Sequence, residues 1–211
     1  MAIQSNFPVI KPSLLLDFAN TKQLDPRITF TRASTATYYN GVTTAKAEEN
    51  LFSYSQDFSN AYWVKTVTTI TANATTAPDG TSTASSFPAI TSGTLNALTS
   101  GSTVGTSGQP LIISIFAKAN TASFLQITPA TAILASSFAN FDLSTGTAGS
   151  IAGTGLTSSI TSVGNGWYRF SVYIKSSVNT SSIPIRIQLL NELGDNTYIG
   201  DGVSGCYVWG F

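Results

Sequence analysis

The chain has 211 residues, which suffices for one large β-sandwich with an N-terminal appendage, and its 10 Lys and Arg balance its 10 Asp and Glu. Charged residues make up only 9%, against roughly 25% in an ordinary globular domain, so Ser, Thr, Asn and Gly must supply the polar surface. Zero net charge provides no basic field and argues against nucleic-acid binding, while the absence of histidine removes the commonest general base and the usual zinc ligand.

The N-terminus predicts synthesis in a cytoplasm and an arm before the main domain. Residues 1–5 lack the basic start and apolar core of a signal peptide, and no apolar run approaches the ~20 residues of a membrane-spanning helix. Pro8, Pro12 and Pro26 fall early in the chain, where they favour an arm and edge strands. We therefore expect an arm over residues 1–48 and a β-sandwich over residues 49–211.

Short segments rich in Val, Ile, Thr, Phe and Tyr recur between Gly, Asn, Asp and Ser clusters, and helical periodicity is hard to find. The predicted strands are Ser13–Phe18, Ile28–Ala33, Leu51–Tyr54, Trp63–Thr71, Ser82–Phe87, Leu111–Lys118, Ser123–Thr128, Ser137–Asp142, Ser158–Val163, Trp167–Lys175, Ile183–Leu190, Thr197–Gly200 and Cys206–Phe211. This spacing predicts an all-β fold, a jelly-roll-type antiparallel β-sandwich.

Turn residues separate these strands. Residues 78–80 (Pro-Asp-Gly), 164–166 (Gly-Asn-Gly) and 201–202 (Asp-Gly) tolerate the positive φ angles that tight turns require. The Gly-, Ser- and Thr-rich stretch 91–108 is predicted as a long flexible loop around a strand-like piece at 95–98, and stretch 145–155 as a link between strands.

The strand Trp167–Lys175 is the most informative segment. Its alternation predicts that Tyr168, Phe170, Val172 and Ile174 face the core. The opposite face then carries Trp167, Arg169, Tyr173 and Lys175. Aromatic rings stack on the apolar C–H faces of sugars, and cationic side chains donate hydrogen bonds to their hydroxyl groups, so this mixture suits carbohydrate.

The next strand repeats the pattern. Ile183, Ile185, Ile187 and Leu189 point one way, while Arg186 and Gln188 point the other way. A hairpin between the two strands would set these polar groups beside Arg169, and Gln126 would extend the same polar face. The candidate carbohydrate-binding residues are Trp167, Arg169, Tyr173, Arg186, Gln188, Gln126 and, at the rim, Trp63. In the alternative interpretation, Trp167 and Tyr173 cover a sheet edge or an interface between subunits.

Catalysis and metal binding have little support in the sequence. Glycoside hydrolysis needs two paired carboxylates, but nothing in the sequence pairs those available, which are Asp17, Asp57, Asp142, Glu192, Asp195 and Asp201. We therefore expect no enzymatic activity and no cofactor. A structural calcium site built from Glu192, Asp195, Asn196 and Asp201 is a weaker alternative, since turn formation explains the same residues. The lone Cys206 is predicted to be a buried small apolar residue rather than a nucleophile.

Two longer segments are familiar. Residues 24–38, from LDPRITF to TATY, resemble a segment that recurs in phage and prophage structural proteins. Residues 49–63 (ENLFSYSQDFSNAYW) look like the start of the carbohydrate-binding-module-like β-sandwich of tail fibres and virion decoration proteins. Segments resembling 77–81, 113–118 and 164–169 follow in that family in the same order.

This resemblance implies a lectin-like sandwich with a role at the virion surface. We expect a tail-fibre or capsid-associated protein, assembled in the host cytoplasm, that binds glycans of host or environmental surfaces without membrane insertion. Other virion proteins and further copies of this chain are its expected partners, with residues 1–48 serving virion attachment or assembly. Two alternatives remain: a purely structural protein that trimerises or cements the capsid, and a polysaccharide depolymerase.

Overall fold

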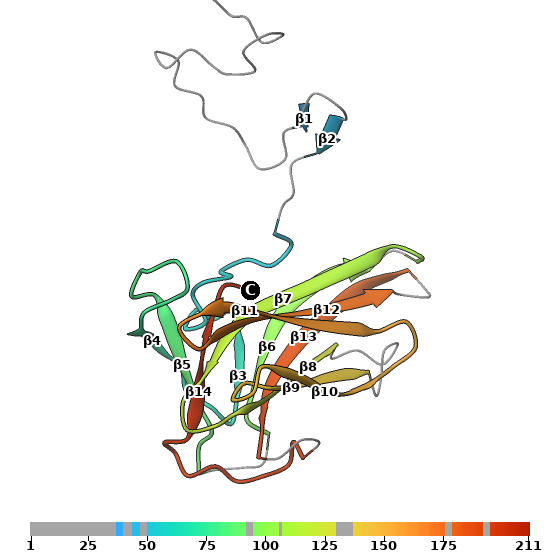
Figure 1. The fold of residues 1–211 in the computed structure, drawn as a ribbon. Helices are drawn as coiled ribbons and strands as arrows, with labels where there is room; N and C mark the ends of the chain where they lie inside the picture. The colour runs from blue at the N-terminus through green and yellow to red at the C-terminus, as the bar shows by residue number, and fades with distance from the viewer. Residues whose placement is uncertain are drawn as a thin grey trace, which may run out of the picture. The chain divides into compact units, whose positions relative to one another are not determined.

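The structure is a computed structural model that describes residues 37–39, 44–46, 50–91, 95–105, 107–129, 137–175, 179–191 and 195–211 (Figure 1). The chain divides into two compact units, Met1–Glu49 and Asn50–Phe211. In the first unit, β1 (Thr37–Tyr39) pairs with β2 (Thr44–Lys46) as an antiparallel hairpin. The predicted strands Ser13–Phe18 and Ile28–Ala33 lie outside the described residues.

The second unit contains two antiparallel sheets, as the all-β prediction requires. The first, called the β13 sheet, has the order β10-β9-β8-β13-β6-β3, and the second, called the β12 sheet, has the order β11-β12-β7-β14-β5-β4. The strands of the β13 sheet are β3 (Val64–Thr66), β6 (Ala97–Gly105), β8 (Phe124–Pro129), β9 (Phe138–Asp142), β10 (Thr147–Ala152) and β13 (Thr180–Leu190). Those of the β12 sheet are β4 (Thr71–Thr75), β5 (Ala84–Pro88), β7 (Pro110–Ala119), β11 (Thr157–Gly164), β12 (Trp167–Lys175) and β14 (Gly205–Trp209).

The core lies between the two sheets, which pack face to face as a β-sandwich. Phe141 of β9 and Phe170 of β12 meet across it, with their ring centroids 4.8 Å apart in an edge-to-face arrangement. The inward residues of both sheets join one apolar cluster, in line with the predicted alternation: Phe170, Val172 and Ile174 from β12, and Ile183, Ile185, Ile187 and Leu189 from β13. Packing of this inner layer fixes which face of each strand points outward.

Turn chemistry behaves as predicted. The β11–β12 turn has positive φ angles at Gly164, Asn165 and Gly166 (90°, 53° and 77°), a conformation that glycine and asparagine adopt at low cost. Gly80 and Gly202 also have positive φ angles, at 87° and 82°. These turns let consecutive strands reverse direction within a few residues.

Five local predictions are wrong. Residues 51–54 form turns and 197–200 form no strand, and the segment predicted as one strand over 63–71 is divided between β3 and β4. The predicted flexible loop over 91–108 contains β6, which pairs with β13 on one side and with β3 on the other. Pairing on both sides stabilises this strand, although its two glycines and two serines have little intrinsic preference for the extended conformation. The predicted link at 145–155 contains β10, which pairs with β9.

Candidate functional site

Strand β12 presents a polar and aromatic face to the outside of the sandwich. Arg169, Tyr173 and Lys175 are exposed, and Ser171 between them is half-buried. The intervening residues point into the core, as the alternation predicts, so backbone pleating alone sets these four side chains on the outer face.

Strand β7 extends this outer face on the side toward β14. Tyr173 stands directly opposite Ile112, Ser171 opposite Ser114, and Arg169 opposite Phe116. Ile112 is 66% exposed and Tyr173 is 36% exposed, so their cross-strand pair forms an apolar surface open to solvent. We call the set Ile112, Ser114, Phe116, Lys118, Arg169, Ser171, Tyr173 and Lys175 the β7–β12 face.

The guanidinium of Arg169 is held in place on this face. Its Nη2 donates a hydrogen bond to Ser114 Oγ at 3.1 Å, and its Cζ lies 5.9 Å from the centroid of the Phe116 ring. The Phe116 ring in turn meets Trp209 of β14 edge to face, at 5.3 Å. A guanidinium fixed by one hydrogen bond and one ring keeps several N–H donors for a ligand.

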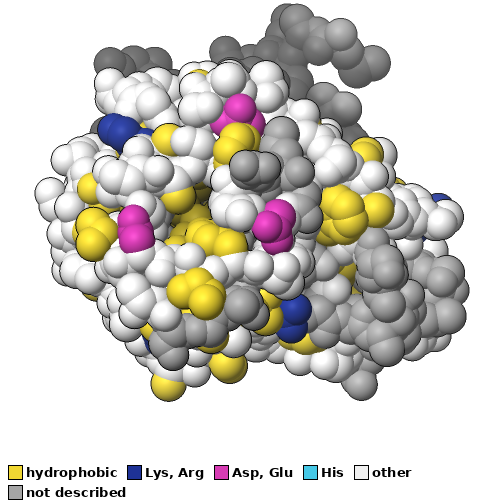
Figure 2. Space-filling view, turned by 90° about the horizontal axis from the view of Figure 1, so that it is seen from below, with side chains coloured by type: hydrophobic (Ala, Val, Ile, Leu, Met, Phe, Trp, Pro, Cys, Tyr) yellow, Lys and Arg dark blue, Asp and Glu magenta, His cyan; other side chains and the backbone are white. Residues whose placement is uncertain are grey.

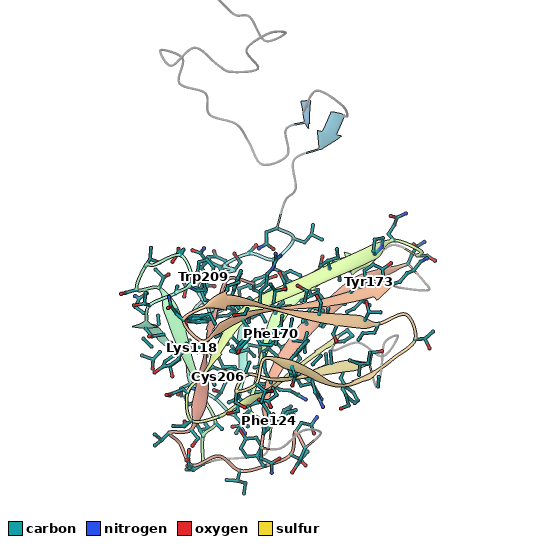
Figure 3. The ribbon with its side chains drawn as sticks, viewed as in Figure 1. Lys118, Phe124, Phe170, Tyr173, Cys206 and Trp209 are labelled. Atoms are coloured by element: carbon teal, nitrogen blue, oxygen red, sulfur yellow. The ribbon has the colours of Figure 1, made fainter. Side chains whose placement is uncertain are left out.

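Figure 3 shows how far the face extends along the strands. Tyr173 is labelled near one end, whereas Lys118 and Trp209 are labelled near the other. The register agrees, because Tyr173 pairs with Ile112 while Lys118 pairs with Trp167 and Tyr207. An elongated surface that combines an apolar pair, hydroxyl groups and cationic side chains can stack a sugar ring and bind its hydroxyl groups.

Trp167 does not join this face at the surface, contrary to the sequence prediction. Its side chain is on the outer side of β12 but only 2% exposed, packed with Ala77 and Ala84. Its Nε1 donates to the Thr76 carbonyl oxygen at 3.2 Å. The β4–β5 connection therefore covers the indole, and this burial gives Trp167 a structural role that alternation alone could not reveal.

The predicted hairpin between β12 and β13 is also wrong. β13 pairs with β6 and β8, and β12 pairs with β11 and β7, so the two strands belong to opposite sheets. Arg186, Gln188 and Gln126 consequently lie on the β13 sheet, away from Arg169. Gln126 does stand directly opposite Gln188, as neighbours on one polar face should.

These two glutamines are buried in a chain of amides that crosses the β13 sheet. Gln188 Nε2 donates to Gln126 Oε1, Gln126 Nε2 to Asn140 Oδ1 at 2.7 Å, and Asn140 Nδ2 to Ser150 Oγ at 3.0 Å. Gln188 is 1% exposed and Asn140 is fully buried. Their amide groups bind one another, which makes this row a stabilising network and not a surface for stacking sugar.

We expect Asn140→Ala to lower the free energy of unfolding by about 1–3 kcal/mol, because it leaves the buried Gln126 amide without its acceptor. Ser150→Ala removes only the exposed end of the chain and should cost about 1 kcal/mol or less. Urea unfolding of both variants measures the difference. Equal effects of the two substitutions would contradict the network.

Trp63, predicted at a binding rim, belongs to the core. It is 1% exposed, and its ring centroid lies 4.9 Å from that of Phe58 and 5.0 Å from that of Phe211. Its Nε1 donates to the Tyr54 carbonyl oxygen at 3.0 Å. Tyr62 is the half-buried member of this pair of adjacent aromatic residues. In the structure neither position lies in a strand, so strand alternation could not decide between them.

The described carboxylates are engaged in their own turns. Each of Asp57, Asp142, Asp195 and Asp201 accepts hydrogen bonds from residues two or three positions further on. Hydrogen bonds from the Ser204 side chain and from the backbone of Ser204 and Val203 lower the pKa of Asp201 to about 2. Burial opposes ionisation of Asp142, but hydrogen bonds from Ser144 and Thr145 outweigh it and lower its pKa.

Within the described ranges, no three His, Cys, Asp or Glu side chains gather as metal ligands. Asp17 and Glu192 lie outside those ranges. Asp195 and Asp201, proposed as calcium ligands from sequence, instead close local turns through Thr197 and Ser204.

Acid should unfold the protein mainly below pH 4. The folded-state pKa of Asp201, and those of Asp79, Asp142 and Asp195, lie below the unfolded value of about 3.9, so their contribution is present above about pH 4 and lost as the pH falls toward 2. Because the chain has no histidine, we expect a flat melting temperature from about pH 5 to 8. A thermal melt across pH 2–8 measures this; a main transition above pH 5 would contradict it. Asp201→Asn should make the acid limb shallower.

Cys206 behaves as predicted. It lies in β14, buried among core residues, and burial raises the pKa of its thiol to about 12. A thiol that stays protonated is a poor nucleophile.

Sequence reasoning missed the contribution of β7 to the site. Its strand was predicted, and alternation within 110–119 could have placed Ile112, Ser114, Phe116 and Lys118 on one side. Which strand lies next to β12 depends on tertiary pairing, so the face could not be assembled from sequence.

No part of the described chain forms a helix long and apolar enough to span a bilayer. The sequence matches no protein-family model and no curated protein, so these comparisons assign the chain to no family.

Proposed function

We propose that this protein is a non-catalytic carbohydrate-binding protein of a phage virion, which attaches to polysaccharides of host or environmental surfaces through the β7–β12 face. The observation that supports it best is the exposed Tyr173–Ile112 pair, flanked by Arg169 and the hydroxyl groups of Ser114 and Ser171. An apolar platform with fixed donors around it matches the two chemical faces of a sugar ring.

The chain as a whole is poor in charged residues, which suits a hydroxyl-rich partner. Charged residues make up 9% of the chain, and Figure 2 shows one side of the molecule on which charged side chains are few and scattered among uncharged groups. Repeated copies on a virion would raise weak single-site affinity by a factor of roughly 10² to 10⁴ through avidity.

Local hydrogen bonding favours binding over hydrolysis. A glycoside hydrolase needs a carboxylic acid with a raised pKa opposite a second carboxylate. The described Asp142, Asp195 and Asp201 side chains have lowered pKa values and are held in turns. Measuring reducing ends released from capsular polysaccharide tests the depolymerase alternative.

Glycan-array retention tests the proposal. We expect Tyr173→Ala to lower retention at least tenfold, because it removes the stacking ring from the surface. Tyr54→Ala is the matched control: it also removes an exposed tyrosine, but outside the face, and should bind as the native protein does. Equal retention of all three proteins would reject the face as the site.

The same apolar pair also fits the structural alternative, in which Tyr173 and Ile112 are buried between copies. Light scattering distinguishes the two functions. A stable oligomer that Ile112→Ser dissociates, together with no signal on the array, would favour assembly.

A further inference from the structure

The β12 sheet carries charge of one sign only. On its six strands the Lys, Arg, Asp and Glu side chains are Lys118, Arg169 and Lys175, with no carboxylate among them. All three belong to the β7–β12 face, because they occupy outward positions of the register. A chain whose positive and negative charges balance overall thus places an entirely basic set on the face proposed to bind sugar.

The spacing of these cations fits a chain-like ligand. Lys118 stands opposite Trp167, one diagonal step from Arg169, which places their Cα atoms about 7–8 Å apart. Lys175 lies six residues beyond Arg169 on the same strand, or about 20 Å away. Tyr173 and its partner Ile112 lie between Arg169 and Lys175. Along the strands, the apolar pair therefore lies between a cation at Arg169 and a second cation at Lys175.

These cations are not neutralised within the described part of the protein. No ion pair joins Lys118, Arg169 or Lys175 to a carboxylate there, and the one hydrogen bond of Arg169 goes to the neutral hydroxyl of Ser114. The carboxylates of Asp79, Asp142, Asp195 and Asp201 accept hydrogen bonds from their own turns. Positive charge on the face is left for a ligand.

We propose that the β7–β12 face binds acidic polysaccharide, with sugar carboxylates at Arg169 and the neighbouring lysines and a sugar ring on Tyr173. This inference rests on the proposed carbohydrate-binding function and specifies its ligand class. A guanidinium pairs with a carboxylate through two parallel hydrogen bonds, which a hydroxyl group cannot match.

Nucleic acid is the less suitable polyanion. Binding to it depends on a strong basic field and on several stacking rings in succession, whereas this chain has zero net charge and the face exposes one tyrosine flanked by isoleucine.

Affinity electrophoresis of the full chain provides the test, with alginate, polygalacturonate and hyaluronan in the gel and carboxyl-reduced forms of the same polymers as neutral counterparts. We expect retardation by the acidic polymers, at least tenfold weaker binding to the reduced forms, and weakening as salt rises. Arg169→Gln should lose about tenfold in affinity for the acidic polymers. Arg186→Gln, which changes an arginine on the opposite sheet, should lose nothing.

The outcomes separate the two proposals. Equal binding to acidic and reduced polymers, lost in Tyr173→Ala, would overturn the charge preference and leave carbohydrate binding intact. If none of the three acidic polymers retarded the protein while neutral glycans on the array bound it, the charge preference would likewise be overturned and carbohydrate binding would stand. Absence of binding to every glycan, neutral or acidic, would overturn the proposed carbohydrate binding itself. Single-stranded DNA bound as tightly as the acidic polymers, or an equal loss in Arg186→Gln, would also refute the inference.

Discussion

Replacing Trp63 with alanine should lower the free energy of unfolding by about 3–5 kcal/mol, which corresponds to a fall of about 6–20 °C in melting temperature. The side chain is 1% exposed and contacts the rings of Phe58, Tyr62 and Phe211. Its removal leaves a cavity where three aromatic side chains meet. Denaturant unfolding followed by far-ultraviolet circular dichroism measures the loss.

This cluster ties the segment before β3 to the last residue described. Phe211 N–H donates to the Ser55 carbonyl oxygen at 2.8 Å, and Asn50 Nδ2 donates to the Phe211 carbonyl oxygen at 2.6 Å. Tyr54→Ala, in the same segment but exposed, is the control and should cost less than about 1 kcal/mol. A Trp63→Ala variant as stable as Tyr54→Ala would show that this cluster does not hold the segment.

Replacing Trp167 with alanine should be equally costly, at about 3–5 kcal/mol, although the residue was predicted from sequence to bind sugar. The indole packs beneath the β4–β5 connection against Ala77 and Ala84. Trp167→Phe keeps most of the packing and loses the hydrogen bond to the Thr76 carbonyl, so it should cost about 1–2 kcal/mol. Thermal melts of both variants measure the gradation.

The contrary result for Trp167 would be informative. If Trp167→Ala had the melting temperature of the native protein and lost only glycan binding, the indole would have to lie at the surface. Because burial predicts the opposite, Tyr173 and Arg169 are the better positions for testing binding.

Local features of the fold were predictable where one physical constraint dominates. In β12 the core face followed from alternation, since a slip of one residue would turn Phe170 and Val172 outward. Turn positions followed from residues that tolerate positive φ, such as Asn165 and Gly202. The β-sandwich followed from the number and spacing of such segments.

Features that depend on distant parts of the chain were not predictable. β6 contains two glycines and two serines, which favour loops, and pairing with β13 and β3 holds it as a strand. Strand order separates Arg186 from Arg169, and no local pattern specifies that order. The burial of Trp167 also depends on a distant segment. Nothing in the sequence Trp167–Lys175 indicates that residues 76–84 lie over its first side chain.

Hydroxyl-radical footprinting, with and without a polysaccharide retained on the array, tests directly whether the β7–β12 face binds sugar. We expect the ligand to protect Tyr173 and Ile112 from oxidation, while the exposed side chains of Tyr54 and Val203 stay as reactive as in the free protein. Protection of Tyr54 or Val203 with unchanged reactivity at Tyr173 and Ile112 would contradict it, and would place the sugar on another surface.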